Sequence, residues 1–305
     1  TPKSNVLEAY LTEIARIRGT GAGVEETSYY GPLANALNEI GRGLKPKVQC
    51  VIQLANAGAG LPDGGLFTAD QCRAKNLSEP LLGQVPSRGV IEVKGPDYDL
   101  DSLIQTKQVE KYWQKYRLVL VTNYRAMALV GTGSDGKPQL LERFSLADTA
   151  TAFWKLAEHP RSAQQKHGTL LAEYLRRVLL HNAPLAAPRD VADILASYAR
   201  DALSRVENAD TPALDSLRTA LSEALGLRFE GERGEHFFRS TLVQTLFYGL
   251  FAAWVLWSRS GRRMADAPPL KIVLAGQEPL RNTLRQSQHA ALLNRIAVRH
   301  HLAPL

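Results

Sequence analysis

The sequence predicts a mixed α/β core followed by an all-helical region, and three observations support this. Strand-like and helix-like stretches alternate up to about residue 146. Beyond that point the apolar residues follow helical spacing, interrupted by prolines, and no strand pattern remains. The length of 305 residues also favours two units, each with its own core. We therefore expect a sheet flanked by helices in residues 1–146 and a helical connector in residues 147–305.

The order of elements in the first part follows from the spacing of its apolar residues. A first helix runs to about Ile17 with Ser4 as a candidate cap, and a second begins near Pro32 and ends by Pro46. Another helix is expected over about 100–113, where Leu100, Ile104, Gln108 and Tyr112 form one stripe. Alternation of apolar side chains predicts five strands, at 48–54, 65–68, 89–94, 118–122 and 126–130.

Composition narrows the class of protein without deciding its function. Lys and Arg number 37 against 30 Asp and Glu, a net charge of +7 that permits nucleic-acid binding without establishing it. The two cysteines, Cys50 and Cys72, form no disulfide framework and lack zinc-ligand spacing. No secretory signal pattern precedes the first helix. These features fit a cytoplasmic protein.

One apolar stretch could suggest a membrane span. Thr241 to Trp257 carries no charge, but it is short for a span, contains Gln244 and is closely bracketed by Arg239 and Arg259. A helix buried within the helical region is the favoured interpretation, so we expect no membrane partner.

Two near-motifs have simpler explanations. Gly131 to Pro138 resembles a phosphate-binding loop, but Pro138 replaces the hydroxyl residue, so a tight Asp135-Gly136 turn joining the preceding strand to Gln139-Leu140-Leu141 is favoured. Asp99 is better explained as the cap of the following helix than as a metal ligand.

The candidate chemistry lies in the predicted strand 89–94. Glu92 and Lys94 are two residues apart, so both face the same side of this otherwise apolar strand. A surface ion pair on an edge strand explains that pair equally well. Asp63, placed among glycines before a preceding strand, favours a different interpretation. Carboxylates from neighbouring strand ends can hold Mg²⁺, and a lysine beside it can act on a water molecule.

Pro62-Asp63 followed by Glu92-Val93-Lys94 resembles the signature of PD-(D/E)xK nucleases, over roughly residues 20–132. The resemblance implies a restriction-endonuclease-like mixed sheet flanked by helices. It also implies that Asp63, Glu92 and the carbonyl of Val93 bind Mg²⁺, with Mn²⁺ as a substitute, and that Lys94 works on the attacking water.

Two supporting residues are implied by the same resemblance. Glu26, with Glu25 as a rival, precedes the first core helix, where such nucleases often carry another acid. Gln108 stands in a Gln-x-x-x-Tyr context that lies near the active site in related nucleases, although a satisfied core amide also explains it.

Further segments are similar to one subgroup, the N-terminal nuclease of type ISP and type IIG restriction–modification enzymes. These are Thr122-Asn123-Tyr124, after the fourth strand, and Gln244 to Ala253, which resembles a helix leading to their methyltransferase domain. The chain has no Asn-Pro-Pro-Tyr motif for amino methylation. A methyltransferase and target-recognition domain are therefore expected in a longer chain or a partner subunit.

The sequence also carries a basic stretch near its C-terminal end. It includes five arginines that are candidates for weak contacts with DNA phosphates, although a solvated helix face or a domain surface explains them equally well. They are Arg259, Arg262, Arg263, Arg281 and Arg285.

The leading hypothesis is a Mg²⁺-dependent endonuclease that cuts double-stranded DNA in a restriction–modification or phage-defence system. Cutting both strands with one site per chain would need two chains to meet transiently. The alternatives are a non-catalytic DNA-binding or assembly module that keeps the nuclease fold, and a nuclease acting on RNA or nicking a special structure.

Overall fold

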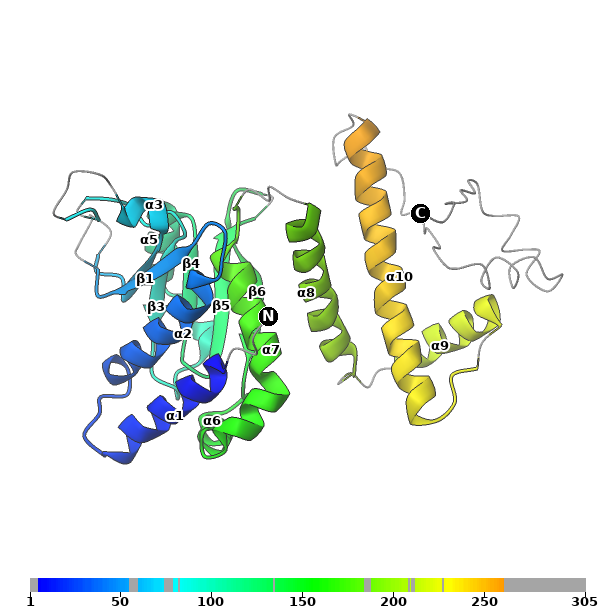
Figure 1. Ribbon diagram of the computed structural model, residues 1–305, viewed down its shortest axis with the longest axis horizontal. Helices are drawn as coiled ribbons and strands as arrows, with labels where there is room; N and C mark the ends of the chain where they lie inside the picture. Colours follow the sequence, from blue (N-terminus) through cyan, green and yellow to red (C-terminus); the bar gives the residue numbers. More distant parts are fainter. Residues whose placement is uncertain are drawn as a thin grey trace. The chain divides into compact units, whose positions relative to one another are not determined.

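The computed structural model describes residues 5–54, 60–73, 79–81, 83–133, 135–183, 188–207, 209, 212–226 and 228–260 (Figure 1). The chain divides into two compact units, Thr1–Ala186 and Ala187–Leu305. The first unit extends past the boundary expected at residue 146, because two helices that follow the sheet pack against it and against the N-terminal helices.

The first unit is built on one six-stranded sheet in which the strands follow chain order. Neighbours are antiparallel except β3 and β4, which are parallel. The five expected strands are present, and β6 is an addition, since the sequence pattern predicted only the tight turn that leads into it. The strands are β1 Val48–Ile52, β2 Gly64–Thr68, β3 Val90–Val93, β4 Val119–Thr122, β5 Ala126–Thr132 and β6 Pro138–Ser145.

Helices precede, connect and follow these strands. The expected helix over 100–113 is split, because Thr106 caps a new helix by accepting a hydrogen bond from the Val109 amide. Asp99 caps the preceding piece by accepting from the Ser102 amide at 2.6 Å, as its sequence context predicted. The elements are α1 Val6–Gly19, η1 Thr27–Tyr29, α2 Tyr30–Arg42, α3 Ala69–Cys72, α4 Leu100–Ile104, α5 Lys107–Tyr116, α6 Ala150–Ala157 and α7 Pro160–Leu179.

The first helix ends close to where the sequence placed it. It begins at Val6 after Asn5, whose side chain makes no capping hydrogen bond, and Ser4, the expected cap, lies outside the described residues.

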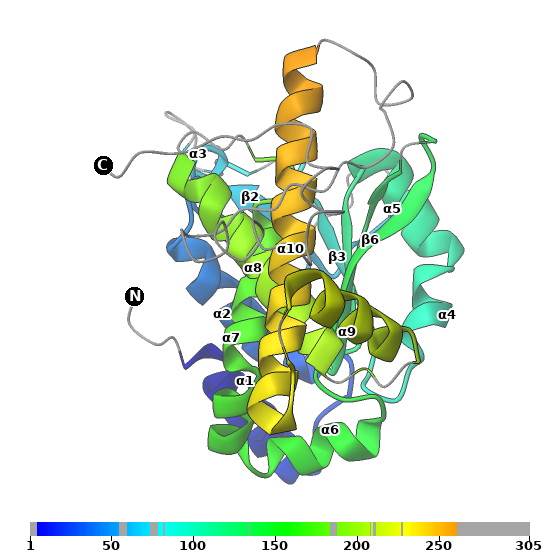
Figure 2. The same cartoon turned by 90° about the vertical axis from the view of Figure 1, so that its right-hand side faces the viewer.

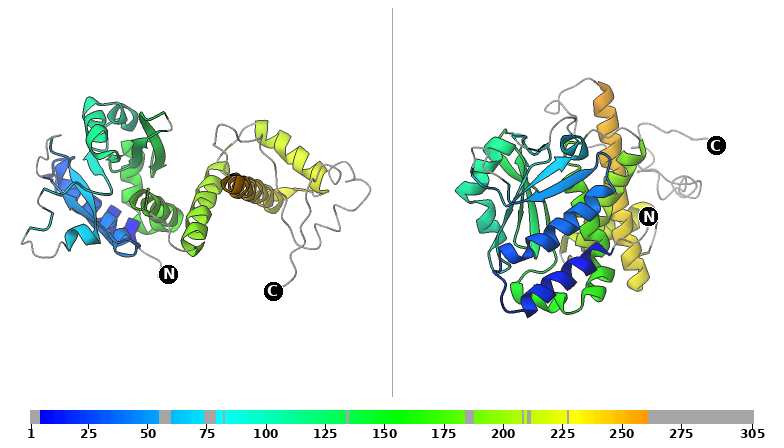
Figure 3. Two further views of the ribbon diagram at one scale, coloured as in Figure 1. Left: turned by 90° about the horizontal axis from the view of Figure 1, so that it is seen from above. Right: turned by 60° about the vertical axis from the view of Figure 1, so that its left-hand side comes forward.

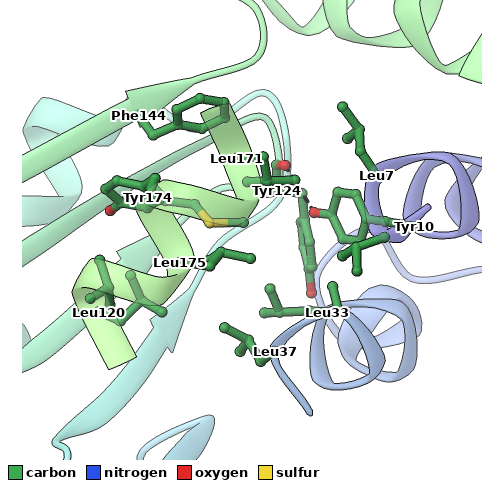
Figure 4. Close-up of a cluster of buried hydrophobic side chains, with 14 of the residues drawn as sticks. Leu7, Tyr10, Leu33, Leu37, Leu120, Tyr124, Phe144, Leu171, Tyr174 and Leu175 are labelled. Atoms are coloured by element: carbon green, nitrogen blue, oxygen red, sulfur yellow. Dashed lines mark hydrogen bonds between the residues drawn. The ribbon is translucent and has the colours of Figure 1, made fainter. Parts of the chain in front are cut away.

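The sheet separates two hydrophobic cores. Helices α1, α2, α6 and α7 cover one face, and α4 and α5 cover the other (Figures 2 and 3). Ile91 and Val93 face the first core and Val90 faces the second, which confirms the alternation expected for this strand. In the larger core, Tyr10 and Tyr124 lie side by side between α1 and the sheet (Figure 4).

The parallel pairing of β3 with β4 begins at a position where only glycine fits. Gly89 has a φ of +89°, and a Cβ built there would lie 2.4 Å from the carbonyl oxygen of Leu118. The next residue, Val90, donates its amide to that same oxygen at 3.1 Å. Gly89 therefore lets the two strands come close enough for β3 to pair.

The second unit is helical in its described residues, with α8 Pro188–Glu207, α9 Pro212–Leu225 and α10 Gly231–Ser260. Phe238 of α10 is fully buried in a small cluster with Leu214 of α9 and Phe229. Helix α10 contains the apolar stretch at 241–257, but the expectation of a buried helix is wrong for much of it within the described residues, where Leu246, Tyr248, Leu250 and Leu256 are exposed. In the described part of the chain, no helix has the length and apolar character that a membrane crossing requires.

We expect Gly89→Ala to lower the free energy of unfolding by about 2–4 kcal/mol, because the methyl group meets backbone and the φ is unfavourable. Gly31→Ala, in open space on α2, is the control and should be neutral or stabilising by up to about 1 kcal/mol. Urea unfolding of the two variants measures both effects. Equal stability of the two variants would contradict the close approach of β3 and β4.

Candidate active site

The candidate site lies where the ends of three inner strands, β2, β3 and β4, meet along one edge of the sheet. Because β3 and β4 are parallel, their carboxyl ends lie at the same edge. Strand β2 is antiparallel to β3, so its first residue, Gly64, lies there too and pairs with Ile91. Asp63 immediately precedes β2 and accepts a hydrogen bond from the Val93 amide on Oδ2 at 2.7 Å. Asp63 and Val93, which are 30 positions apart in the chain, are thus in direct contact.

Glu92 is the buried acid of this site, with a side chain only 1% exposed. Its Oε2 accepts a hydrogen bond from the Gln108 amide at 3.1 Å. Its Oε1 lies 3.1 Å from Lys94 Nζ, an ion pair that leaves this oxygen without a well-oriented hydrogen bond. Burial, and next the negative charge of Asp63, raise the pKa of Glu92 to about 7 although Lys94 opposes the shift.

Lys94 is held by three oxygens. Its Nζ donates to the carbonyl of Val93 at 2.8 Å and to Glu26 Oε1 at 3.2 Å, and it pairs with Glu92. Burial by itself lowers the pKa of Lys94, but the negative charges of Glu92 and Glu26, together with the hydrogen bond to Glu26, outweigh it and raise the pKa. The side chain is therefore an ammonium at neutral pH.

Three tyrosines support these groups, and of the three the sequence analysis named only Tyr124, as part of the segment after the fourth strand. The Tyr30 hydroxyl donates to Asp63 Oδ1 at 2.5 Å. The Tyr124 hydroxyl donates to the carbonyl of Glu26, and the Tyr10 hydroxyl donates to the carbonyl of Tyr124 at 2.9 Å. These contacts join residues far apart in the chain, so no local spacing could have indicated them.

Tyr124 reaches Glu26 because of the turn after β4. Its φ is +68°, and its amide donates to the Thr122 hydroxyl. The side chain of Asn123 closes the same turn by accepting from the Ala126 amide at 2.9 Å. The Thr122-Asn123-Tyr124 segment, noted for its resemblance, thus directs a fully buried ring toward the segment that carries Glu26.

The structure brings together all five residues proposed for the core of the site: Asp63, Glu92, Lys94, Glu26 and Gln108. Glu26, and not its neighbour Glu25, forms the ion pair with Lys94. The proposed DNA-contacting arginines are not placed: Arg262, Arg263, Arg281 and Arg285 lie outside the described residues, and so does the side chain of Arg259.

The oxygen atoms of the site fit a hard divalent cation. Among the described residues, no three acidic, histidine or cysteine side chains group at metal-binding spacing. Mg²⁺ is commonly held by one or two carboxylates and several waters, so Asp63, Glu92 and the carbonyl of Val93 suffice as protein ligands. The repulsion between the buried Glu92 and Asp63, which the ion pair with Lys94 opposes only in part, favours a further positive charge here.

No family model matches the chain, and a search of curated proteins gives no match. Among solved structures, one match is described as "cryoEM structure DrdV-DNA complex". It is 18% identical, with a TM-score of 0.34 over 95% of this chain and 25% of that chain. The present chain thus spans about a quarter of the length of that protein.

Glu92 should make the stability of the metal-free protein depend on pH. Its pKa in the folded protein, about 7, exceeds the ordinary 4.5, so the folded state binds the extra proton and loses stability as the pH rises through 7. Glu92→Gln, which resembles the protonated form, should match the parent at pH 5. At pH 8 it should be more stable by on the order of 1–3 kcal/mol.

Urea unfolding in the presence of a chelator at both pH values measures this difference. Glu39→Gln, which alters an exposed carboxylate paired with Arg42, is the control and should shift stability equally at pH 5 and pH 8. A Glu92→Gln effect that does not change with pH would contradict the raised pKa.

Proposed function

We propose that this chain is a Mg²⁺-dependent DNA endonuclease that hydrolyses phosphodiester bonds. The observation that carries the proposal is the convergence of Asp63, Glu92 and Lys94 at one sheet edge, with direct contacts between Asp63 and Val93 and between Glu92 and Lys94. An ion pair on an edge strand would account for Glu92 and Lys94. It would not account for Asp63, which comes from the start of β2 and accepts a hydrogen bond from the Val93 amide.

In the proposed mechanism, Asp63, Glu92 and the carbonyl of Val93 would hold the cation. Mg²⁺, when bound, lowers the pKa of a coordinated water and polarises the phosphoryl oxygen. Gln108 donates to Glu92 Oε2 and so fixes the orientation of the carboxylate, whose other oxygen, Oε1, lies beside the Lys94 ammonium.

Lys94 contributes positive charge and hydrogen-bond donation. Because its pKa is raised, it enters the reaction as an ammonium that can orient the attacking water and offset charge on the phosphate. Glu26 positions that ammonium through the 3.2 Å ion pair, and Tyr124 anchors the backbone of Glu26.

The proposed substrate is double-stranded DNA, supported by the net charge of +7 and by the resemblance of the sequence signature. The same resemblance supports a role in a restriction–modification or phage-defence system. Sequence choice would then depend on a methyltransferase and target-recognition domain in a longer chain or a partner subunit. Double-strand cleavage would require two chains to meet.

Supercoiled plasmid incubated with the chain and Mg²⁺ should be converted to nicked and linear forms. We expect Asp63→Asn and Lys94→Ala each to slow this conversion by about 100-fold or more, since each removes a charge worth several kcal/mol in the transition state. Gel electrophoresis over a time course measures the rates, and a chelator should abolish cleavage by the parent.

Asp97→Asn is the matched control, because Asp97 is an exposed carboxylate just beyond β3 that makes none of the site contacts, and its rate should equal the parent's. Equal rates in all four proteins would contradict the assignment of the site. The alternative of a non-catalytic DNA-binding module predicts a gel shift with duplex DNA and no Mg²⁺-dependent loss of supercoiled plasmid.

A further inference from the structure

We infer that Tyr30 is a positioning residue for Asp63. The hydroxyl of Tyr30 fixes the orientation in which the Asp63 carboxylate would bind a divalent cation. The inference rests on the proposed function, because it assigns a role in the same site. It concerns a residue outside the Asp63, Glu92, Lys94 signature and 33 positions before Asp63 in the chain.

The geometry gives Asp63 two separate anchors. Tyr30 donates to Oδ1 at 2.5 Å, and the Val93 amide donates to Oδ2 at 2.7 Å. The two donors come from different elements, α2 and β3, and each carboxylate oxygen receives one hydrogen bond. A carboxylate oxygen has two acceptor directions, so each oxygen keeps one for another partner. The pair of anchors fixes the plane of the carboxylate.

The ring of Tyr30 is itself immobilised. Tyr30 is the first residue of α2, is 7% exposed and belongs to the large core cluster with Leu33 and Leu37 of the same helix. Its hydroxyl therefore has a defined position at the boundary between that core and the polar site. A tyrosine combines an apolar body with a polar tip, which suits this boundary.

The hydrogen bond has a fixed direction. The ordinary pKa of a phenol, about 10, lies well above neutral pH. The phenol stays protonated and must act as the donor. Hydrogen bonds to charged acceptors are about twice as strong as neutral ones, so this contact can hold the carboxylate firmly.

A phenylalanine at position 30 would keep the core filled and remove only this donor. The Asp63 carboxylate would then keep its hydrogen bond from the Val93 amide but could rotate about that contact. Binding of a cation would have to restrict this rotation, which would weaken the affinity. Loss of a group that orients a metal ligand typically weakens metal affinity by about 10–100-fold. A purely structural role would lower stability instead and leave metal affinity unchanged.

The test is Mn²⁺ binding to the metal-free chain without DNA, followed by the electron paramagnetic resonance signal of free Mn²⁺. Parent, Tyr30→Phe, Asp63→Asn and Tyr116→Phe are compared, with urea unfolding of each. Tyr116 is the matched control, a buried tyrosine of α5 in the other core. We expect Tyr30→Phe to raise the dissociation constant by about 10–100-fold while Tyr116→Phe matches the parent.

A second measurement distinguishes a loss of Asp63 positioning from a general loss of catalytic activity. In plasmid cleavage, Tyr30→Phe should raise the Mg²⁺ concentration giving half the maximal rate, while the rate at saturating Mg²⁺ recovers to within a few-fold. A lowered saturating rate with an unchanged Mg²⁺ requirement would overturn the inference.

The binding outcomes distinguish failure of the inference from failure of the proposed function. If Tyr30→Phe binds Mn²⁺ like the parent while Asp63→Asn binds it weakly, Tyr30 does not position Asp63 and the metal site still stands. If Asp63→Asn binds Mn²⁺ as tightly as the parent, or the parent binds none, the proposed metal site fails and this inference with it.

Discussion

The parallel pairing of β3 and β4 within an otherwise antiparallel sheet is the constraint on which the site depends. It requires a crossover, supplied by α4 and α5, and it places the carboxyl ends of both strands at one edge. One strand end supplies Glu92 and Lys94, and the other begins the turn that carries Tyr124 toward Glu26. The crossover helix α5 supplies Gln108 above the same edge.

The burial of Glu92 carries an energetic cost that shapes its surroundings. A carboxylate at 1% exposure next to Asp63 ionises reluctantly, which is why its pKa rises to about 7. Lys94 and Gln108 offset part of this cost without removing it. A bound cation would relieve the repulsion between these two carboxylates, which is the physical argument for the proposed metal site.

The sequence predicted those parts of this site that depend on local geometry. The alternation along β3 placed Glu92 and Lys94 on one face, and helical spacing turned Gln108 toward the sheet; both are confirmed by direct contacts. Helices α6 and α7 belong to the first unit, which could not be predicted, since helical periodicity gives no sign of where a helix packs. Tyr30 and Tyr124 could not be predicted either, because tertiary packing alone brings them to Asp63 and Glu26.

These tyrosines show how the core and the site are joined. Tyr10, Tyr30 and Tyr124 all belong to the larger hydrophobic cluster, yet each uses its hydroxyl on a carboxylate or a main-chain carbonyl. The packing that stabilises α1 and α2 against the sheet therefore also determines where Asp63 and Glu26 lie. A cavity in that core would displace polar groups at the sheet edge, so the precision of the site depends on the apolar residues behind it.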